Sequence, residues 1–265
     1  MQHSQKVTAK KHLGQHFLND EAIAFNIVNA LVEKCQTSYV LEIGPGMGVL
    51  TKYLLEKPFE LHAIDVDQES IDYLKKHYPQ MENRVFHGDF LRIDIKTLFK
   101  EEFSVIGNFP YNISSQIVFK ILENKEQIPL MTGMFQKEVA ERICSGPGNK
   151  EYGILSVFTQ LYYTCEYLFT VPENVFTPPP KVKSGVMRMV RKADPPQVDQ
   201  KMFYRVVKAA FNQRRKKLRN AISQFGVSDE ILQPSGYSDK RAEQLSFTDF
   251  ITLTNIIIEH GTNGN

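Results

Sequence analysis

The sequence predicts an α/β protein in which a mostly parallel, doubly wound sheet is followed by a small domain of helices only. From residue 20 to residue 144, short apolar segments of strand length alternate with helical patterns. This alternation is typical of parallel strands joined by helices. Several apolar segments end at glycine or at an acid, and from residue 197 onward the apolar spacing is helical only.

The predicted strands are apolar runs of five or six residues that end at turn-forming residues. They cover residues 39–43, 61–65, 84–89, 103–108 and 130–135. Two later runs, 166–171 and 185–190, are expected to form an antiparallel pair.

The first helix is predicted to begin near Asp20, because an acidic cap there precedes apolar residues at helical spacing. Further helices are expected over residues 49–56, 69–77, 114–122 and 137–144. Residues 154–163 are apolar enough for either element, and we favour a helix. After residue 197, one helical face collects Phe203, Val206, Val207, Ala210 and Phe211.

The length of 265 residues suits one large domain and one small domain. We expect a mobile basic arm over residues 1–12, a sheet domain over 13–192 and a helical domain over 197–265. The proline-containing segment 193–196 is the predicted linker.

Composition argues against several classes of protein. No apolar run of about 18 residues occurs, so no membrane span is expected, and the N-terminus lacks the apolar segment of a signal peptide. The three cysteines are far apart without a CxxC pair, which suggests neither a disulfide framework nor a metal site. A reducing, cytoplasmic location fits. The net charge of +2 says little about nucleic acid.

A glycine-rich loop follows the first strand, at residues 44–48 (Gly-Pro-Gly-Met-Gly). Gly44 and Gly46 let the backbone approach a ligand, and the next helix presents free N–H groups. Val49 occupies the third glycine position of the dinucleotide fingerprint, which disfavours a nicotinamide dehydrogenase. A tight turn without a ligand is the alternative interpretation.

Two acids end the next strands. Asp65 lies 21 positions after Gly44, where a carboxylate can accept hydrogen bonds from both ribose hydroxyls. Asp67 is an alternative for that role, and Asp89, after the third strand, suits an adenine amine. Each of these acids could instead cap a helix or a turn. Together with the loop, they indicate an adenosine-bearing ligand across the strand ends.

The fourth strand ends in residues 108–111 (Asn-Phe-Pro-Tyr), which match the needs of alkylation at an exocyclic amine. Asn108 supplies a carbonyl acceptor for the amine hydrogens, and Pro110 has no N–H to compete with backbone carbonyls. Tyr111 supplies a stacking face. Taken alone, these four residues, which we call the tetrad, more often form a proline turn with a tyrosine in the core. Its place beside the glycine loop and the acids favours a catalytic loop.

Residues 214–219 form a basic run with five cations in six residues: Arg214, Arg215, Lys216, Lys217 and Arg219. We expect most of them to point outward from a helix and to bind RNA phosphates, since no acid is interleaved to relieve their repulsion. A merely solvated face is the alternative. Five lysines elsewhere in the chain are expected to extend this RNA-binding surface: Lys6, Lys10, Lys11, Lys181 and Lys183.

The chain closely resembles the ribosomal RNA adenine dimethylase family, and within it the small-subunit branch. The resemblance runs from about residue 11 to about residue 247 and rests on ordered motifs: Asp89 and residues 14–18 (Gly-Gln-His-Phe-Leu), 42–46 (Glu-Ile-Gly-Pro-Gly), 108–114 (Asn-Phe-Pro-Tyr-Asn-Ile-Ser) and 176–182 (Phe-Thr-Pro-Pro-Pro-Lys-Val). The motifs are individually short but specific as an ordered set.

This resemblance implies a Rossmann-like class I methyltransferase sheet, S-adenosylmethionine as the methyl donor and no metal. It places donor contacts on His16, Leu18, Gly44, Gly46, Asp65, Asp89 and Asn108. It also suggests Phe176 as a second aromatic wall of the base pocket, although a hydrophobic plug is the alternative. Three residues depart from the family's usual ones: His16 replaces Asn, Asp65 replaces Glu and Phe109 replaces Leu.

The resemblance further implies dimethylation of N6 on two adjacent adenosines near the 3′ end of small-subunit rRNA, within an assembling ribosomal subunit. A large-subunit rRNA adenine methylase of the antibiotic-resistance (Erm) type shares the fold and motifs and is the first alternative. Residues 211–216 look more like the small-subunit branch. A non-catalytic ribosome-assembly factor is the second alternative. No heptad stretch is present, and we expect a monomer.

Overall fold

The computed structural model describes residues 7–262, and within it the chain divides into two compact units. One comprises Met1–Ala140 with Thr164–Arg191, and the other comprises Glu141–Tyr163 with Lys192–Asn265. Residues 141–163 therefore group with the C-terminal helices, although the domain predicted from the sequence ran without interruption from 13 to 192. Among the described residues, no helix is long and apolar enough to cross a membrane.

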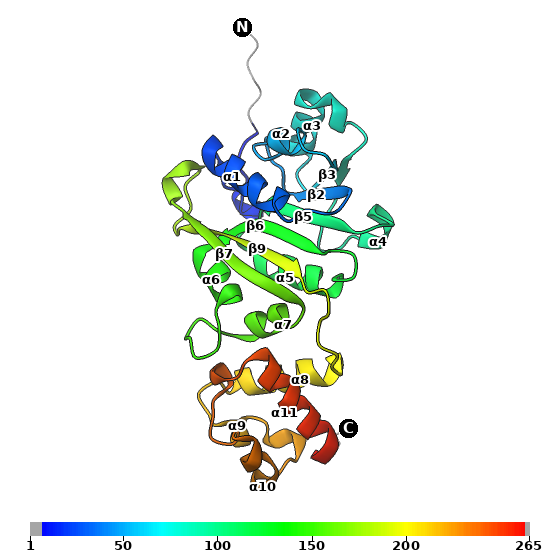
Figure 1. The fold of residues 1–265 in the computed structure, drawn as a ribbon. Coiled ribbons are helices and arrows are strands. Elements are labelled where there is room, and N and C mark those ends of the chain that lie inside the picture. The colour runs from blue at the N-terminus through cyan, green and yellow to red at the C-terminus, as the bar shows by residue number, and fades with distance from the viewer. Residues whose placement is uncertain (1–6, 263–265) are drawn as a thin grey trace. The chain divides into compact units, whose positions relative to one another are not determined.

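The first unit is built on a seven-stranded sheet in the order β4-β3-β2-β5-β6-β9-β7 (Figure 1). The strands are β2 Tyr39–Ile43, β3 Glu60–Asp65, β4 Val85–His87, β5 Phe103–Asn108, β6 Leu130–Gln136, β7 Tyr163–Val171 and β9 Ser184–Arg191. Pairing is parallel from β4 to β6 and antiparallel between β6 and β9. The predicted doubly wound, mostly parallel sheet is confirmed.

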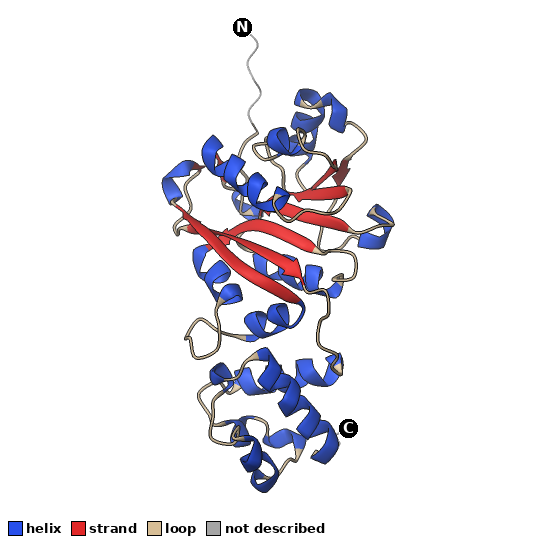
Figure 2. Cartoon of the chain, in the orientation of Figure 1, coloured by secondary structure: helices blue, strands red, loops and turns tan. Residues whose placement is uncertain are grey.

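Helices cover both faces of this sheet (Figure 2). They are α1 Glu21–Val32, α2 Thr51–Leu54, α3 Gln68–His77, α4 Ile95–Leu98, α5 Ser114–Glu123 and α6 Lys137–Cys144. Figure 1 shows α1, α2 and α3 on one face and α5 on the other. The predicted helix over 49–56 is shorter than expected, because Gly48 has a φ of +80° before it and Pro58 follows it.

The core explains why these segments fold as they do. Ile27, Val28 and Leu31 of α1 are fully buried, as the helical spacing predicts. The central strands β2 and β5 are buried on both faces, which is typical of parallel sheets. Side-chain oxygens of Asp20 and Asp67 accept backbone N–H groups at the starts of α1 and α3.

A second, two-stranded sheet joins segments that are distant in sequence. β1 Phe17–Leu18 pairs antiparallel with β8 Phe176–Thr177. Six short 3₁₀ helices complete the described elements: η1 Lys11–Leu13, η2 Pro79–Met81, η3 Glu173–Val175, η4 Ser223–Phe225, η5 Gln233–Ser235 and η6 Ala242–Gln244.

The second unit is helical, as predicted for the C-terminal part. Its helices are α7 Ile154–Tyr162, α8 Gln200–Asn212, α9 Leu218–Ala221, α10 Asp229–Leu232 and α11 Phe247–His260. Phe203 and Val207 of α8 and Phe250 of α11 are fully buried, so the predicted apolar face of α8 packs in a core.

The basic run does not lie on this helix, so that part of the prediction is wrong. α8 ends at Asn212, and residues 213–217 form turns before α9. Like charges one turn apart destabilise a helix. The turn and the helix α9 that follows it instead bring three of the cations to acids that the local sequence does not contain: Arg214 to Glu243, and Lys217 and Arg219 to Asp239.

Candidate functional site

A cavity of about 230 Å³ opens beyond the carboxyl ends of β2, β3, β4 and β5. The strand order reverses between β2 and β5, and ligands of open α/β sheets bind at this kind of position. The cavity is lined by nine of the residues that the sequence singled out: His16, Leu18, Gly44, Gly46, Asp65, Asp89, Asn108, Pro110 and Tyr111.

The glycine loop takes a conformation that side chains disfavour. Gly44 and Gly46 have φ values of +67° and +55°. A Cβ atom on Gly46 would lie 2.8 Å from the ring of Phe17. These glycines therefore let the loop turn tightly under residues 16–18 while it lines the cavity.

Asp65 ends β3 and lines the cavity, although only 7% of the residue is exposed. Its Oδ1 accepts a hydrogen bond of 2.9 Å from the Asp67 amide. Burial raises the pKa of its carboxyl, although backbone hydrogen bonds partly oppose this. A carboxylate held there by the backbone is oriented to accept further hydrogen bonds from a ligand.

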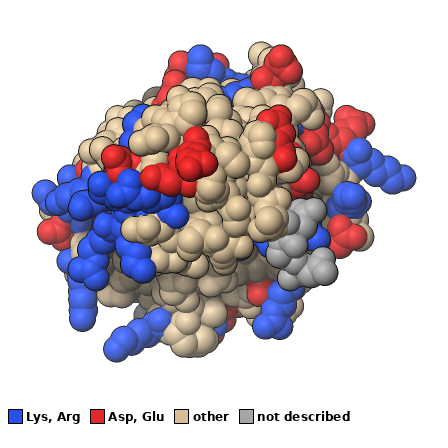
Figure 3. Space-filling view, turned by 90° about the horizontal axis from the view of Figure 1, so that it is seen from below, with Lys and Arg blue, Asp and Glu red and all other residues tan. Residues whose placement is uncertain are grey.

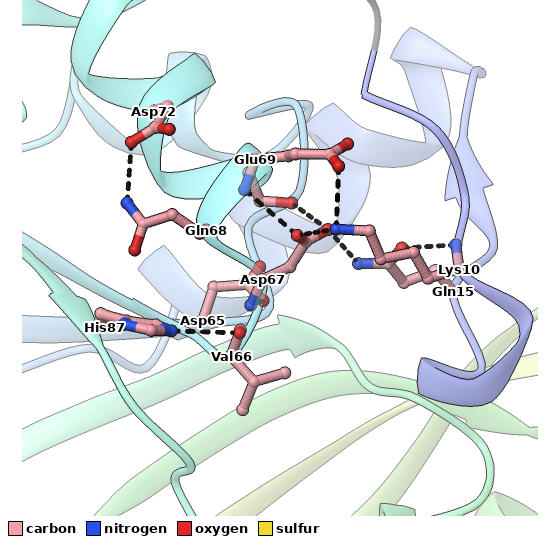
Figure 4. Close-up of polar contacts among 10 residues, drawn as sticks. Lys10, Gln15, Asp65, Val66, Asp67, Gln68, Glu69, Asp72 and His87 are labelled. Carbon is pink, nitrogen blue, oxygen red and sulfur yellow. Dashed lines mark hydrogen bonds and ion pairs between the residues drawn. The ribbon is translucent and has the colours of Figure 1, made fainter.

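Asp67, the alternative to Asp65, is committed elsewhere and does not line the cavity. It accepts hydrogen bonds from Lys10 Nζ at 2.5 Å and from Gln15 Nε2 at 3.0 Å, and it caps α3 through the Glu69 amide (Figure 4). Burial raises its pKa, but the hydrogen bonds from Gln15 and Lys10 outweigh burial and hold the pKa below its ordinary value. Asp67 is therefore a structural acid.

Asp89 lines the cavity after β4 and also orders its own turn. Its Oδ1 accepts from the Leu91 amide at 2.9 Å, and Arg92 Nε lies 3.5 Å from Oδ2. The alternative turn role of Asp89 is therefore present in the structure, and its contact with a ligand stays a prediction for a side chain that lines the cavity.

Glu42 in β2 is a third acid on the cavity and is almost completely buried. Its Oε2 accepts a hydrogen bond of 2.6 Å from Thr51 Oγ1. Burial raises the pKa of Glu42 to about 8, so at neutral pH its carboxyl is largely protonated. In the sequence, Glu42 is marked only by its place in the motif over residues 42–46.

Asn108 ends β5, and its side chain has a defined orientation. Its Nδ2 donates a hydrogen bond of 2.9 Å to the main-chain carbonyl of His16. One N–H of the amide is therefore engaged, and Oδ1 is the atom of this side chain that can accept hydrogens from a ligand. The structure thus gives Asn108 the polarity that an amine substrate needs.

Phe109 anchors the tetrad to the sheet. It is 1% exposed and packs against Phe135, with 5.0 Å between ring centroids. Gly107 and Gly133 make room for its ring, since a Cβ atom on Gly133 would lie 2.1 Å from Phe109 Cε2. The Pro110 carbonyl closes the turn by accepting from the Ile113 amide at 3.2 Å. One of its two lone pairs remains for a ligand.

Tyr111 lines the same cavity, and its ring is held at two points. Its hydroxyl is hydrogen-bonded to Ser184 Oγ at the start of β9. The imidazole of His16 stacks on its ring, with 5.5 Å between centroids and 29° between planes. His16 Nδ1 in turn donates a hydrogen bond of 2.7 Å to the Pro178 carbonyl. His16 therefore contacts the tetrad and also lines the cavity that is predicted to hold the methyl donor.

The N-terminal segment is fixed to the first unit over residues 10–18. Lys10 lies between the carboxylates of Asp67 and Glu69 (Figure 4), and the Lys10 amide donates to Gln15 Oε1 at 2.8 Å. The ion pairs raise the pKa of Lys10 and occupy its charge. At Lys10, the predicted arm is thus held by contacts with the first unit, whereas residues 1–6, including Lys6, lie outside the described residues.

Phe176 is not brought to the cavity. It is 3% exposed, pairs with Leu18 in the two-stranded sheet and belongs to the hydrophobic core. Its position matches the alternative interpretation of a hydrophobic plug.

The predicted RNA contacts differ in how far their charges are neutralised. Arg214, Lys217 and Arg219 form the ion pairs described above. Among the described residues, no acid lies within ion-pair distance of the remaining four cations: Lys181, Lys183, Arg215 and Lys216. Lys11 and these four residues are available to phosphates, with exposed or partly exposed side chains.

Two hydrogen bonds of the site could not be predicted from the local sequence. Gln15 and Ser184 act through Asp67 and Tyr111, more than 50 positions away in each case. The motif residues 14–18 and 176–182 mark their neighbourhoods, but only the fold shows which side chains meet.

Comparison with known proteins identifies the family. The family model described as ribosomal RNA adenine dimethylase matches residues 6–259. The chain is 56% identical over 256 residues to a protein named ribosomal RNA small subunit methyltransferase A from Cytophaga hutchinsonii, covering 96% of this chain and 98% of that protein. A protein of the same name from Flavobacterium johnsoniae is 56% identical over 259 residues, with coverage of 97% and 98%.

Solved structures show the same fold. A dimethyladenosine transferase from Plasmodium falciparum superimposes with a TM-score of 0.79 at 24% identity, covering 93% of this chain and all of that chain. The 23S rRNA methyltransferase ErmE superimposes with a TM-score of 0.74 at 24% identity, covering 91% and 99%. The fold is therefore that of a class I methyltransferase with C-terminal helices. By its sequence, the chain belongs to the ribosomal RNA adenine dimethylase family.

Proposed function

We propose that this protein transfers methyl groups from S-adenosylmethionine to N6 of two adjacent adenosines near the 3′ end of small-subunit rRNA. The observation that carries the proposal is the hydrogen bonding of Asn108, which lines the cavity and donates from Nδ2 to the His16 carbonyl, so that Oδ1 is left as an acceptor for a ligand. Whole-length relatives named as small-subunit methyltransferases support this substrate over large-subunit RNA.

The cavity residues fit the donor. Asp65 and Asp89 place acidic side chains around the cavity, which suits a cationic ligand that carries ribose hydroxyls and an adenine amine. The protonated carboxyl of Glu42 adds a hydrogen-bonding group without a charge. Val66 and Leu91 add apolar walls for a flat base. When bound, S-adenosylmethionine supplies a methyl group made electrophilic by its sulfonium.

The tetrad supplies what adenine N6 lacks. The lone pair of N6 is delocalised into the ring, so the amine is a poor nucleophile. Hydrogen bonds from its two hydrogens to Asn108 Oδ1 and the Pro110 carbonyl favour a pyramidal nitrogen, and Tyr111 stacks on a base taken out of the RNA stack. Positioning is then the main contribution of the chain. A strong general base is unnecessary, since the product ammonium is acidic.

RNA binding rests on cations without acidic partners. On the face that Figure 3 displays, Lys and Arg side chains gather most densely at the left of the view. Arg215, Lys216, Lys181 and Lys183 are the predicted contacts whose charges stay available to phosphates. We propose that the target is presented in an assembling subunit in the cytoplasm and that the protein acts as a monomer.

Replacing Asn108 tests the proposal. Asn108→Ala should reduce methyl transfer from labelled donor to purified, undermethylated small subunits by about 100-fold or more, since one positioned acceptor for the reacting group is lost. Asn108 is also a predicted contact of the donor, so donor binding measured by calorimetry should weaken as well, but by much less than methyl transfer. That difference separates loss of chemistry from loss of the donor site. Undiminished incorporation would contradict the role given to Asn108.

The same assay separates the alternatives. An enzyme of the Erm type should methylate naked large-subunit RNA in preference to assembled small subunits. A non-catalytic assembly factor should give no calorimetric signal with S-adenosylmethionine.

A further inference from the structure

Residues 178–183 form a stiff, exposed loop between β8 and β9, which we name the proline ridge. Its first three residues are prolines, whose rings fix the backbone φ angles. Pro180 is buried and anchors the middle of the ridge, whereas Lys181, Val182 and Lys183 are exposed. The ridge therefore presents an apolar side chain between two cations, directly after three residues whose rings restrict the backbone and beside the Lys183 carbonyl, which is hydrogen-bonded to the Lys137 amide.

Both ends of the proline ridge are joined to the tetrad. At one end, the Pro178 carbonyl accepts a hydrogen bond of 2.7 Å from His16, whose ring stacks on Tyr111. At the other end, Ser184 is hydrogen-bonded to the Tyr111 hydroxyl, and the Lys183 carbonyl accepts from the Lys137 amide at 2.9 Å. The ridge thus begins and ends at partners of the ring that is proposed to hold the target base.

Val182 is 46% exposed, one of the few large hydrophobic residues on the described surface. Val66, with a similar exposure, lines the cavity, and Ile258 lies on α11 far along the chain. An isolated exposed valine is ordinary on a protein surface. What distinguishes Val182 is its place two residues before Ser184, the hydrogen-bond partner of Tyr111, and its two lysine neighbours, which have no acidic partner among the described residues.

An apolar tip between two cations suits stacked RNA. Proteins that unstack nucleic acid insert an apolar wedge between neighbouring bases and hold the backbone with Lys or Arg. Removing a base from the stack costs free energy that something must offset. A stiff loop is better suited to this role than a flexible one, because it loses little conformational entropy on binding.

We infer that the proline ridge separates the target adenosine from its stacked neighbour, with Val182 as the wedge and Lys181 and Lys183 holding the flanking phosphates. The inference deepens the proposed function and rests on it for the identity of the RNA. Val182 is then a positioning residue: it acts on the neighbouring base and leaves the donor site untouched.

The experiment compares Val182→Ala with the conservative Val182→Ile and with Ile258→Ala, which truncates an aliphatic side chain of similar exposure elsewhere. Each variant is mixed with a hairpin RNA carrying two adjacent adenosines, in which 2-aminopurine replaces the base beside the target. The fluorescence of 2-aminopurine rises when it loses its stacking partner, whether or not methyl transfer occurs. Methyl transfer to undermethylated small subunits and the donor dissociation constant are measured alongside.

Wild type, Val182→Ile and Ile258→Ala should give the same fluorescence rise, whereas Val182→Ala should give a much smaller one at saturating protein. Its kcat on small subunits should fall by about tenfold, with an unchanged donor dissociation constant. A wild-type rise that Val182→Ala retains in full, or no rise with wild type, would overturn the inference. The fluorescence rise could also depend on Val182 while the wild-type protein transfers no methyl group. That result would support the role of the proline ridge and contradict the proposed function.

Discussion

The side chain of Asn108 is oriented by a main-chain carbonyl 92 positions away in the sequence. A single hydrogen bond engages the nitrogen end of the amide and leaves Oδ1 as the atom that can accept from an amine. Tyr111 is fixed in the same way, by Ser184 and by His16. At this scale, the chemistry of the tetrad depends on neighbours outside the tetrad.

Glu42 leads to a prediction about pH. Its pKa of about 8 lies above the ordinary value of 4.5, so the folded state binds its proton more tightly than the unfolded state does. The resulting contribution to stability is fully present below pH 4.5 and is lost as pH rises through about 8. Between pH 6 and pH 8, this loss is about 2 kcal/mol for one buried group.

Glu42→Gln should remove that dependence, since a neutral amide does not titrate. The check is urea unfolding of both proteins at pH 6 and pH 8. The free energy of unfolding of wild type should fall more steeply with pH than that of Glu42→Gln. Parallel pH profiles would contradict a protonated Glu42 in the folded protein.

Among the elements, the N-terminal segment 10–18 connects several site residues. Gln15 and Lys10 bind Asp67, the His16 carbonyl binds Asn108, and β1 pairs with β8. The segment also lines the cavity from residue 12 onward. Binding of S-adenosylmethionine should therefore depend on the hydrogen bonds by which Asp67 holds the segment 10–18 in place.

Asp67→Asn should weaken S-adenosylmethionine binding by about tenfold, because charged hydrogen bonds to Lys10 and Gln15 are lost. Glu69→Gln is the matched control, since Glu69 also pairs with Lys10 but is more than half exposed and should matter little. Calorimetry with both variants checks this, and hydrogen exchange of residues 10–18 should rise in Asp67→Asn alone. Equal affinities for the two variants would show that the segment does not depend on Asp67.

Much of the element structure could be predicted from the sequence, because local patterns determine it. The bounds of β2 and β5 match the predicted ones, and the strand ends carry the expected side chains. The two-residue strands β1 and β8 were missed, since each is too short to show a period and forms only by pairing with the other. The helical basic run was wrong, because the acids that draw its cations into a turn come from residues 239 and 243.

At the scale of the whole molecule, the two units carry different properties. The first holds the cavity and the tetrad, and the second holds the basic run. Within that run, ion pairs neutralise three cations and leave Arg215 and Lys216 without acidic partners among the described residues. The sequence showed the charges, but only the fold shows which of them are compensated.

The double substitution of Arg215 and Lys216 by Ala should weaken binding to small subunits. It should also reduce the slope of the logarithm of the dissociation constant against the logarithm of salt concentration, by the amount that corresponds to about two phosphate contacts. Lys217→Ala, which removes a cation paired with Asp239, should change the salt dependence less. Binding measured over a series of salt concentrations gives both slopes. If Lys217→Ala changes the slope as much as the double substitution does, the distinction between paired and unpaired cations fails.

The central claim is the transfer of methyl groups to N6 of adjacent adenosines in small-subunit RNA, with Asn108 holding the amine. Mass mapping of small-subunit RNA after incubation with S-adenosylmethionine tests it most directly, with wild type and Asn108→Ala in parallel. We predict two adjacent N6-dimethyladenosines near the 3′ end with wild type and unmodified adenosines with Asn108→Ala. Methylation at another position, on another atom or undiminished in Asn108→Ala would contradict the account.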